Sequence, residues 1–243
     1  MHGVGFLVHK ESLTYVMGCK PISSRVITIC LRAKPFKMTL IQAYAPTTDK
    51  SDAEVEEFYE QLQKAYDKVP KGDIVIVLGD WNSKVGTDTF EDWKEIQGPS
   101  CNSLSNERGQ RLLEFASYNS FVLANTFGVH TKARTHTYHS PLGIPHQIDY
   151  ILVPKRYRSS INTSKTHAFP GADCGSDHDL VLLSMRIKLK KVKKKPFTRM
   201  KFDLEKLNDP NIAKEFKAAI GGRFAPLLIY DDDKKLGRND SIF

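Results

Sequence analysis

The stretch that decides the fold is IVIVLGDWN, residues 74–82. Residues 74–79 are apolar on both faces of a strand, as in sheets that are covered on both sides. Together with helical patterns elsewhere, this predicts an α/β layered architecture rather than an open β-sheet. Asp80 and Asn82 follow the strand, and Trp81 between them would point to the opposite side if the strand continued. Asp and Asn also start turns, so the rest of the chain must decide whether they form a site.

Segments rich in β-branched residues predict further strands, and two amphipathic patterns predict helices. The first helix begins at Ser51 or Asp52, both plausible N-caps, and carries Val55, Phe58 and Leu62 at helical spacing. The second helix follows Asn106 and carries Leu112, Leu113, Phe115 and Ala116 on its candidate buried side. The strands are expected at 3–8, 24–31, 37–44, 73–79, 120–125, 146–153 and 179–189.

The formal net charge is +8, but its source is local. Seven of the positive charges come from one short run: Arg186, Lys188, Lys190, Lys191, Lys193, Lys194 and Lys195. A run of this kind is a solvated linker, a surface that contacts a phosphate backbone, or a nuclear address. It supports a nucleic-acid partner only in combination with other features.

The four cysteines form no C-x-x-C pair, so neither a zinc knuckle nor a disulfide framework is indicated. No run approaches the roughly 20 apolar residues that span a bilayer. The amino terminus also lacks the pattern of a secretory signal. We therefore expect a soluble, intracellular protein in a reducing compartment, without a membrane partner.

The character of the chain changes after Lys195, where Pro196 interrupts the strand pattern. Residues 203–224 carry apolar side chains at roughly helical intervals, and the segment after them has the composition of a disordered tail. This predicts a core domain over 1–190, a basic linker over 191–201, and a helical segment with a disordered tail over 202–243.

His178 lies between Asp177 and Asp179 at the start of an apolar run. Imidazole is a ready proton donor near neutral pH, and a nearby carboxylate fixes its tautomer and raises its pKa. Asp149, within the apolar segment IDYILV, is the natural partner because an unpaired Asp there would be costly. Tyr44, in QAYAP, either packs in the strand or offers its phenol to a phosphate or a metal-bound water.

The motifs GVGFLV, AYAP, GDWN, IDYILV and SDHDLV occur in an order and spacing that resemble the endonuclease/exonuclease/phosphatase superfamily, which includes deoxyribonuclease I. NERGQRLLEF and the segment 202–216 are similar to the endonucleases of RTE-type retrotransposons. The resemblance implies two packed, mostly antiparallel β-sheets flanked by helices, a four-layer sandwich whose first strands are expected to be missing from this chain.

The resemblance also implies a reaction, namely divalent-metal-dependent cleavage of DNA that leaves a 5′ phosphate and a 3′ hydroxyl. Asp80 would activate the attacking water and Asn82 would position it. Asp177 would hold Mg²⁺, or alternatively Mn²⁺, while His178, oriented by Asp149, would stabilise the phosphorane. Tyr44 would contact the scissile phosphate.

The chain also departs from the family pattern. An Asn and a metal-binding Glu are normally found upstream of GVGFLV, and neither is present in this sequence. Magnesium is typically held by one or two carboxylates with water and phosphate, so losing one ligand weakens the site. The alternatives are therefore an inactive descendant that binds nucleic acid or protein, and a phosphatase of the same superfamily. A nuclear location is expected from the lysine run, and the oligomeric state is left open.

Overall fold

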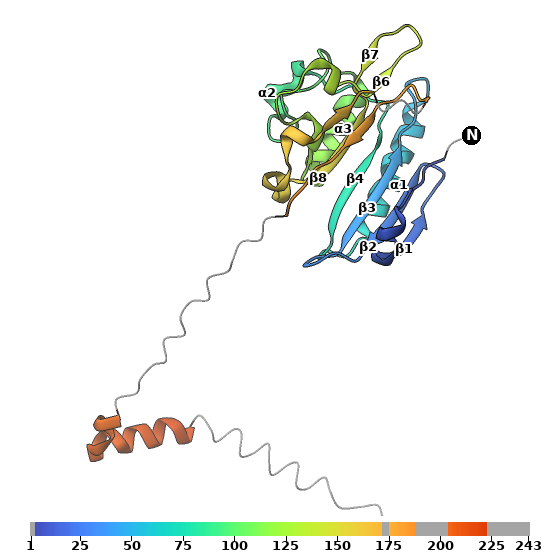
Figure 1. Cartoon of the computed structure of the whole chain (residues 1–243). Helices are drawn as coiled ribbons and strands as arrows, with labels where there is room; N and C mark the ends of the chain where they lie inside the picture. The colour runs from blue at the N-terminus through green and yellow to red at the C-terminus, as the bar shows by residue number, and fades with distance from the viewer. Residues whose placement is uncertain (1–2, 172–174, 188–203, 223–243) are drawn as a thin grey trace, which may run out of the picture. The chain divides into compact units, whose positions relative to one another are not determined.

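The computed structural model describes residues 3–171, 175–187 and 204–222. The chain divides into two units, Met1–Leu189 and Lys190–Phe243. The first is built on a six-stranded sheet with the order β1-β2-β3-β4-β8-β5 (Figure 1). The β3–β4 pair is parallel and the other four pairs are antiparallel.

The strands of the large sheet are β1 (Val16–Pro21), β2 (Val26–Leu31), β3 (Met38–Tyr44), β4 (Ile74–Asp80), β5 (Phe121–Leu123) and β8 (Asp149–Pro154). Two small ladders are formed by β6 (Tyr138–His139) with β7 (Pro145–His146), and by β9 (His167–Phe169) with β10 (Leu180–Leu182). The α-helices are α1 (Asp52–Asp67), α2 (Phe90–Trp93) and α3 (Glu107–Tyr118). Short 3-10 helices are η1 (Lys10–Tyr15), η2 (Thr87–Thr89), η3 (Ala124–Thr126), η4 (Lys132–Arg134), η5 (Lys155–Ser160), η6 (Thr163–Lys165) and η7 (Leu204–Asn208).

Both long helices begin at side-chain caps. The Ser51 hydroxyl accepts a hydrogen bond from the Glu54 backbone N–H, and the Glu54 carboxylate accepts one from the Ser51 N–H at 3.1 Å. This capping box satisfies two backbone donors that a helix start would otherwise leave without partners. At α3 the Asn106 side chain accepts a hydrogen bond from the Gly109 N–H at 2.8 Å. Ser51 and Asn106 therefore fix the starts expected from the sequence.

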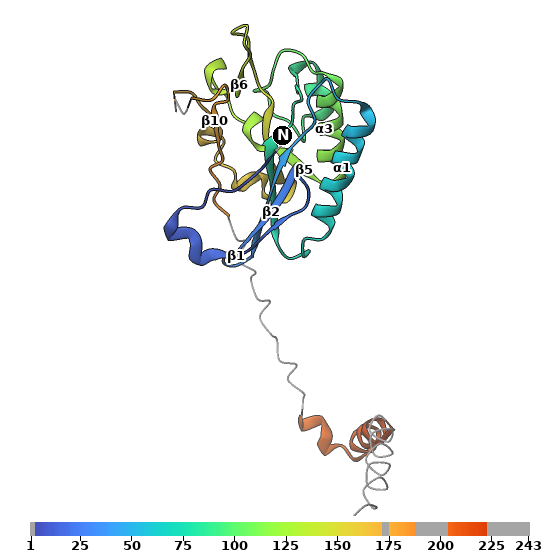
Figure 2. The ribbon, with the colours of Figure 1, turned by 90° about the vertical axis from the view of Figure 1, so that its right-hand side faces the viewer.

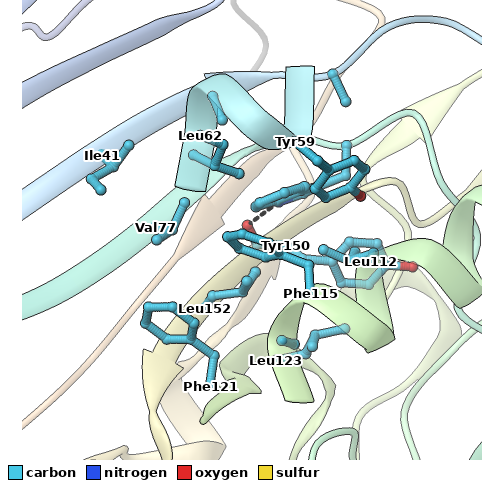
Figure 3. Packing of buried hydrophobic residues seen from close by; sticks show 14 of the residues in the cluster. Ile41, Tyr59, Leu62, Val77, Leu112, Phe115, Phe121, Leu123, Tyr150 and Leu152 are labelled. Carbon is cyan, nitrogen blue, oxygen red and sulfur yellow. Dashed lines mark hydrogen bonds between the residues drawn. The ribbon is translucent and has the colours of Figure 1, made fainter. Parts of the chain in front are cut away.

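Helices α1 and α3 cover one face of the sheet. Figure 3 shows Tyr59 and Leu62 of α1 and Phe115 of α3 packed over Val77 and Tyr150 of the strands. The indole N–H of Trp81 donates to the Tyr150 carbonyl at 2.9 Å within this core. Fully burying side chains of this size contributes about 1.5–3 kcal/mol each, so this face anchors the strands that carry the site.

The opposite face of the sheet packs against β10 and its flanking residues. Ile74 and Ile76 of β4 and Ile151 of β8 form a second buried cluster, against which Val181 of β10 packs. Figure 2 shows α1 and α3 on one side of the large sheet and β10 on the other. The α/β prediction, with mostly antiparallel sheets flanked by helices, is confirmed. Among the described residues the second sheet consists of the β9–β10 pair.

One predicted strand is wrong. Residues 3–8 belong to no strand, and β1 forms the edge next to β2 instead. Phe6 and Val8 line an apolar cavity with β2 and β3 side chains, while Leu7 is fully exposed. Strand-like composition indicates side chains that suit a half-buried surface, and does not require a paired backbone. The strand predicted at 179–189 is also shorter, since β10 ends at Leu182.

In the second unit, η7 is followed by a helix over residues 210–222, as the apolar spacing predicted. The basic linker expected at 191–201 and the tail after residue 222 lie outside the described residues, so the nuclear address stays a prediction. Across the described parts of both units, no helix is long and apolar enough to cross a bilayer.

Candidate active site

Tyr44, Asp80 and Asp149 lie at one edge of the sheet, on three neighbouring strands. Tyr44 is opposite Asp80 in the parallel β3–β4 pair, and Asp80 is opposite Asp149 in the antiparallel β4–β8 pair. Leu78 and Ile151, two positions away, pack on the face that α1 and α3 do not cover. Because side chains alternate along a strand, the three polar side chains project from that same face. The sheet thus assembles a row of two carboxylates and a phenol.

The surroundings of Asp80 shift the pKa of its carboxyl group. Burial, together with the charge of the neighbouring Asp149, raises its pKa from 3.8 to about 6. The Asn82 N–H, at 2.9 Å from Oδ1, and the imidazole of His178 act in the opposite direction. A carboxyl group with a pKa near 6 is a better proton acceptor than an ordinary aspartate and is still mostly ionised at pH 7.

Asn82 is held beside Asp80 by its own backbone conformation. Its φ of 47° lies in the left-handed region, which Asn tolerates better than most residues. Its side-chain amide donates to the Ala45 carbonyl at 3.0 Å, while Trp81 is buried on the helix side. The prediction that Asp80 and Asn82 share a side opposite Trp81 matches these contacts.

His178 is bonded to Asp149, with 3.0 Å between Nδ1 and Oδ2. This hydrogen bond raises the pKa of His178, although burial opposes it, and the charges of Asp149, Asp80 and Asp177 add to the increase. The imidazolium form is therefore stabilised next to the carboxylate row. The sequence had predicted this pairing, and the structure brings the two residues together.

A short backbone ladder positions the segment that carries Asp177 and His178. The His139 N–H donates to the Asp177 carbonyl at 2.8 Å, and the Asp179 N–H donates to the Thr137 carbonyl at 2.9 Å. His139 also contacts Asp179 through its side chain, at 3.0 Å between Nε2 and Oδ2. The Asp177 charge acts on both Asp80 and His178, so all six predicted site residues gather at this edge.

Several residues that support the site were not predicted from the sequence. Thr137, which is buried, accepts hydrogen bonds from the backbone of Ile148 and Asp149, and Asn125 donates to the Asp149 carbonyl at 3.0 Å. The Arg25 guanidinium lies 5.2 Å from the Tyr44 ring. A lone Thr, Asn or Arg carries no local signal of such a role, because its partner is distant in the chain.

Three rings form a row across neighbouring segments. Tyr138 is opposite His146 in the β6–β7 pair and opposite His178 in an isolated bridge. The Tyr138 and His178 rings are 5.0 Å apart, and the Tyr138 and His146 rings are stacked at 6.5 Å. A partly exposed row of flat rings next to the His178 imidazole suits contact with a sugar or a base.

The site opens into a cavity of about 470 Å³ lined by Asp80, Asp149, His178 and Asp179, together with apolar residues of β4, β8 and β10. A larger cavity of about 730 Å³ lies between residues 6–15 and the sheet. Its lining is mainly apolar and includes none of the six site residues. We therefore place the candidate site at the smaller cavity, where the carboxylates and the imidazole converge.

The donor set at the site consists chiefly of carboxylate and amide oxygens, which suits a hard cation such as Mg²⁺ better than a soft metal. Among residues 3–171, 175–187 and 204–222, no group of three His, Cys, Asp or Glu side chains is placed to hold a metal ion. Magnesium requires only one or two protein carboxylates when water and substrate phosphate complete its shell. The residues therefore fit such an ion as an open site, not as a closed cage.

A family model described as "Endonuclease/Exonuclease/phosphatase family" matches residues 5–178, a range that contains all six site residues. The chain is also similar to craniofacial development protein 2 of Bos taurus, with 41% identity over 199 residues, which are 81% of this chain and 33% of the relative. The same-named protein of Tragulus javanicus is 40% identical over 199 residues, 81% of this chain and 34% of the relative. The chain thus spans about a third of the length of these curated relatives.

The chain is also similar to solved structures, including the following two. The AP endonuclease LMAP from Leishmania major has a TM-score of 0.52 and 15% identity, covering 74% of this chain and 64% of that one. The endonuclease domain of TRAS1, a telomere-specific non-LTR retrotransposon, has a TM-score of 0.48 and 17% identity, covering 69% and 66%. The likeness to the Leishmania protein shows a common fold.

Proposed function

Because the chain belongs to the endonuclease/exonuclease/phosphatase family, we propose that it is a retrotransposon-derived, metal-dependent endonuclease that hydrolyses phosphodiester bonds in DNA. The observation that supports this most is the row of Tyr44, Asp80 and Asp149, with His178 bonded to Asp149. The row places a carboxylate of raised pKa next to an imidazole stabilised in its charged form. Together they provide a proton acceptor for water and a cationic donor for the phosphate.

Asp80 accepts the proton of the attacking water. The bond between the water oxygen and phosphorus forms as the bond from phosphorus to the 3′ oxygen breaks, which leaves a 5′ phosphate and a 3′ hydroxyl. The leaving 3′ oxygen takes its proton from solvent. Asn82, anchored on Asp80 and on the Ala45 carbonyl, keeps the water and the phosphate in place.

His178 stabilises the charge that develops on the phosphate oxygens. Its Nδ1 is engaged by Asp149, so the Nε2–H on the other side of the ring is the group directed at the substrate. Tyr44 contacts the scissile phosphate through its phenol. The rings of Tyr138 and His146 extend the site toward the adjoining nucleoside.

Asp177 would hold one Mg²⁺ together with water and phosphate oxygens, and Mn²⁺ is the alternative ion. When bound, the cation would offset the charge on the phosphate and on the leaving oxygen. Burial is the main cause of the raised pKa of Asp80, and the charges of Asp149 and Asp177 add to it; a cation at this edge would offset that repulsion.

A second candidate function is binding of nucleic acid without cleavage. It is favoured by the stretch from Phe115 to Ile148, which contains no Asp or Glu and whose second half lies beside the site. In that case the rings of Tyr138, His146 and His178 and the surrounding cations would hold DNA. The carboxylates would bind a metal ion too weakly for turnover.

Nicking of supercoiled plasmid by the purified chain separates the two candidates. We expect relaxed circles with magnesium, none with chelator, and none with Asp177→Ala or His178→Ala. His9→Ala is the matched control, because His9 is an exposed histidine at the start of η1 and should nick as the parent chain does. Binding without any nicking by the folded parent chain would favour the second candidate.

A further inference from the structure

A long part of the chain next to the site carries no negative side chain. From Phe115 to Ile148 the sequence contains neither aspartate nor glutamate. Its cationic and imidazole side chains are Lys132, Arg134, His130, His136, His139 and His146. The fold places the second half of this stretch beside the acidic row, since Tyr138 bridges to His178 on one side and pairs with His146 on the other.

Three side chains of this stretch, together with one from the loop after β4, form a surface that we name the basic flank: Lys132, His136, His146 and Lys84. Lys84 follows Asn82 by two residues, and its backbone is fixed by Asn106, which accepts its N–H at 2.9 Å and donates to its carbonyl at 3.0 Å. Lys84 and His136 both lie close enough to His146 for their charges to act on it, and Lys132 acts on His136 in the same way. The flank thus combines the loop after β4, η4 with the residues that follow it, and β7, which pairs with β6 beside the site.

An acidic site needs such a surface if its substrate is a polyanion. Asp80, Asp149 and Asp177 repel phosphates, and nucleic acid brings a negative charge with every nucleotide. Cations placed beside the carboxylates compensate this repulsion and guide the substrate inward. We propose that the basic flank binds the sugar-phosphate backbone of nucleic acid next to the cleavage site, an inference that rests on the proposed function.

The two histidines make this surface sensitive to pH. Burial lowers the pKa of His136, as do the charges of His139 and Lys132, while Asp179 opposes them. Burial also lowers the pKa of His146, together with Lys84 and His136, and the Tyr138 ring stacks on it. A bound phosphate favours the charged imidazole, so binding takes up protons. Because both pKa values are lowered in the free protein, affinity rises as the pH falls toward and below the ordinary histidine value of about 6.5.

The test is the salt dependence of DNA binding by the full chain, measured by fluorescence anisotropy with a labelled duplex in chelator. Each lost phosphate contact lowers the slope of log affinity against log salt by about 1. At about pH 5.5 we expect His136→Gln/His146→Gln to lower the slope by about 1 to 2 relative to the parent chain. At about pH 8, where both imidazoles are neutral, the two slopes should coincide.

Lys84→Gln provides a second variant, because it removes a phosphate contact that involves no histidine, and it should lower the slope by about 1 at both pH values. His9→Gln is the control and should change neither slope. Equal slopes for the double variant and the parent chain at pH 5.5 would overturn the proposal. Binding of the chain to an acidic protein but not to the labelled duplex would also overturn it. The binding assay needs no cleavage, so the two proposals can fail separately. If the chain nicks DNA but the variants leave the salt slope unchanged, the basic flank is wrong and the endonuclease proposal stands. If the variants change the slope but the chain does not nick DNA, the endonuclease proposal is wrong and the basic flank stands.

Discussion

Asp80 and Asp149 are paired directly across β4 and β8, so two carboxylates with different partners lie side by side at the end of these strands. Burial and the charge of Asp149 raise the pKa of Asp80 to about 6, whereas Asp149 is bonded to the imidazole of His178 at 3.0 Å. One carboxylate thus becomes a proton acceptor and the other stabilises a cation. This division of roles within one backbone pair is the basis of the predictions that follow.

The rate of cleavage should follow a bell-shaped pH profile. Activity should rise as Asp80 loses its proton, with an apparent pKa near 6, and should fall at higher pH as the imidazolium of His178 loses its own. Because the pKa of His178 is raised, the falling limb should lie above the ordinary histidine value of about 6.5. Single-turnover rates across this range test the profile, and a rate independent of pH below 7 would contradict it.

Asp149→Asn should move both limbs of that profile to lower pH. The substitution removes the charge that adds to the effect of burial on the pKa of Asp80, and it replaces the hydrogen bond from His178 to a carboxylate, which raises the pKa of His178, by a weaker one to a neutral amide. We expect the pKa of the His178 imidazole, followed by proton NMR, to fall, and the cleavage rate at pH 7 to drop by about 10- to 100-fold, in the range of one acid–base contribution. An unchanged His178 titration would show that the 3.0 Å contact has no energetic role.

Asp80→Asn should make the folded chain more stable while abolishing cleavage. The pKa of Asp80 is raised in the fold, so the native state favours its protonated form, and that stability is lost as the pH rises through about 6. The Asn variant keeps the neutral form, and at pH 7 its free energy of unfolding should be higher by on the order of 2 kcal/mol. At pH 4 the gain should largely vanish. Urea unfolding at both pH values is the measurement, and a variant less stable than the parent at pH 7 would refute the prediction.

Gly79→Ala should separate β3 from β4. A Cβ at Gly79 would lie 1.9 Å from the Ala43 carbonyl oxygen, which is backbone and cannot move aside cheaply. Overpacking of this kind costs about 1–3 kcal/mol, and it would displace Tyr44 relative to Asp80. Gly72→Ala is the matched control, because a Cβ there meets nothing within 4 Å. Thermal unfolding should distinguish the two variants, and equal stabilities would contradict the close approach of the strands.

Much of the site could be predicted from the sequence because its residues lie at or near one end of a strand whose apolar pattern can be recognised locally. The apolar run before Asp80 and the one around Asp149 predict where the strands end, and the sheet then brings these ends together. The starts of α1 and α3 were equally clear, since capping residues act through bonds to their own neighbours in the chain.

The parts of the fold and the site that could not be predicted depend on contacts between segments distant in the sequence. The Tyr138–His178 bridge and the bonds from Ile148 and Asp149 to Thr137 have no local signature. Residues 3–8 have strand-like composition, but composition cannot tell which segment pairs with β2, and β1 takes that place. The effect of Lys84 on His146 likewise exists only because the loop after β4 folds back toward β7.

The most direct measurement is end-group analysis of a defined DNA oligonucleotide after incubation with the purified chain and magnesium, beside the Asp80→Asn variant. The account predicts cleavage by the parent chain that leaves only 5′ phosphate and 3′ hydroxyl ends, and none by the variant. Intact DNA with the folded parent chain, or equal cleavage by the variant, would contradict the claim that the row of Tyr44, Asp80 and Asp149 is a working phosphodiesterase site.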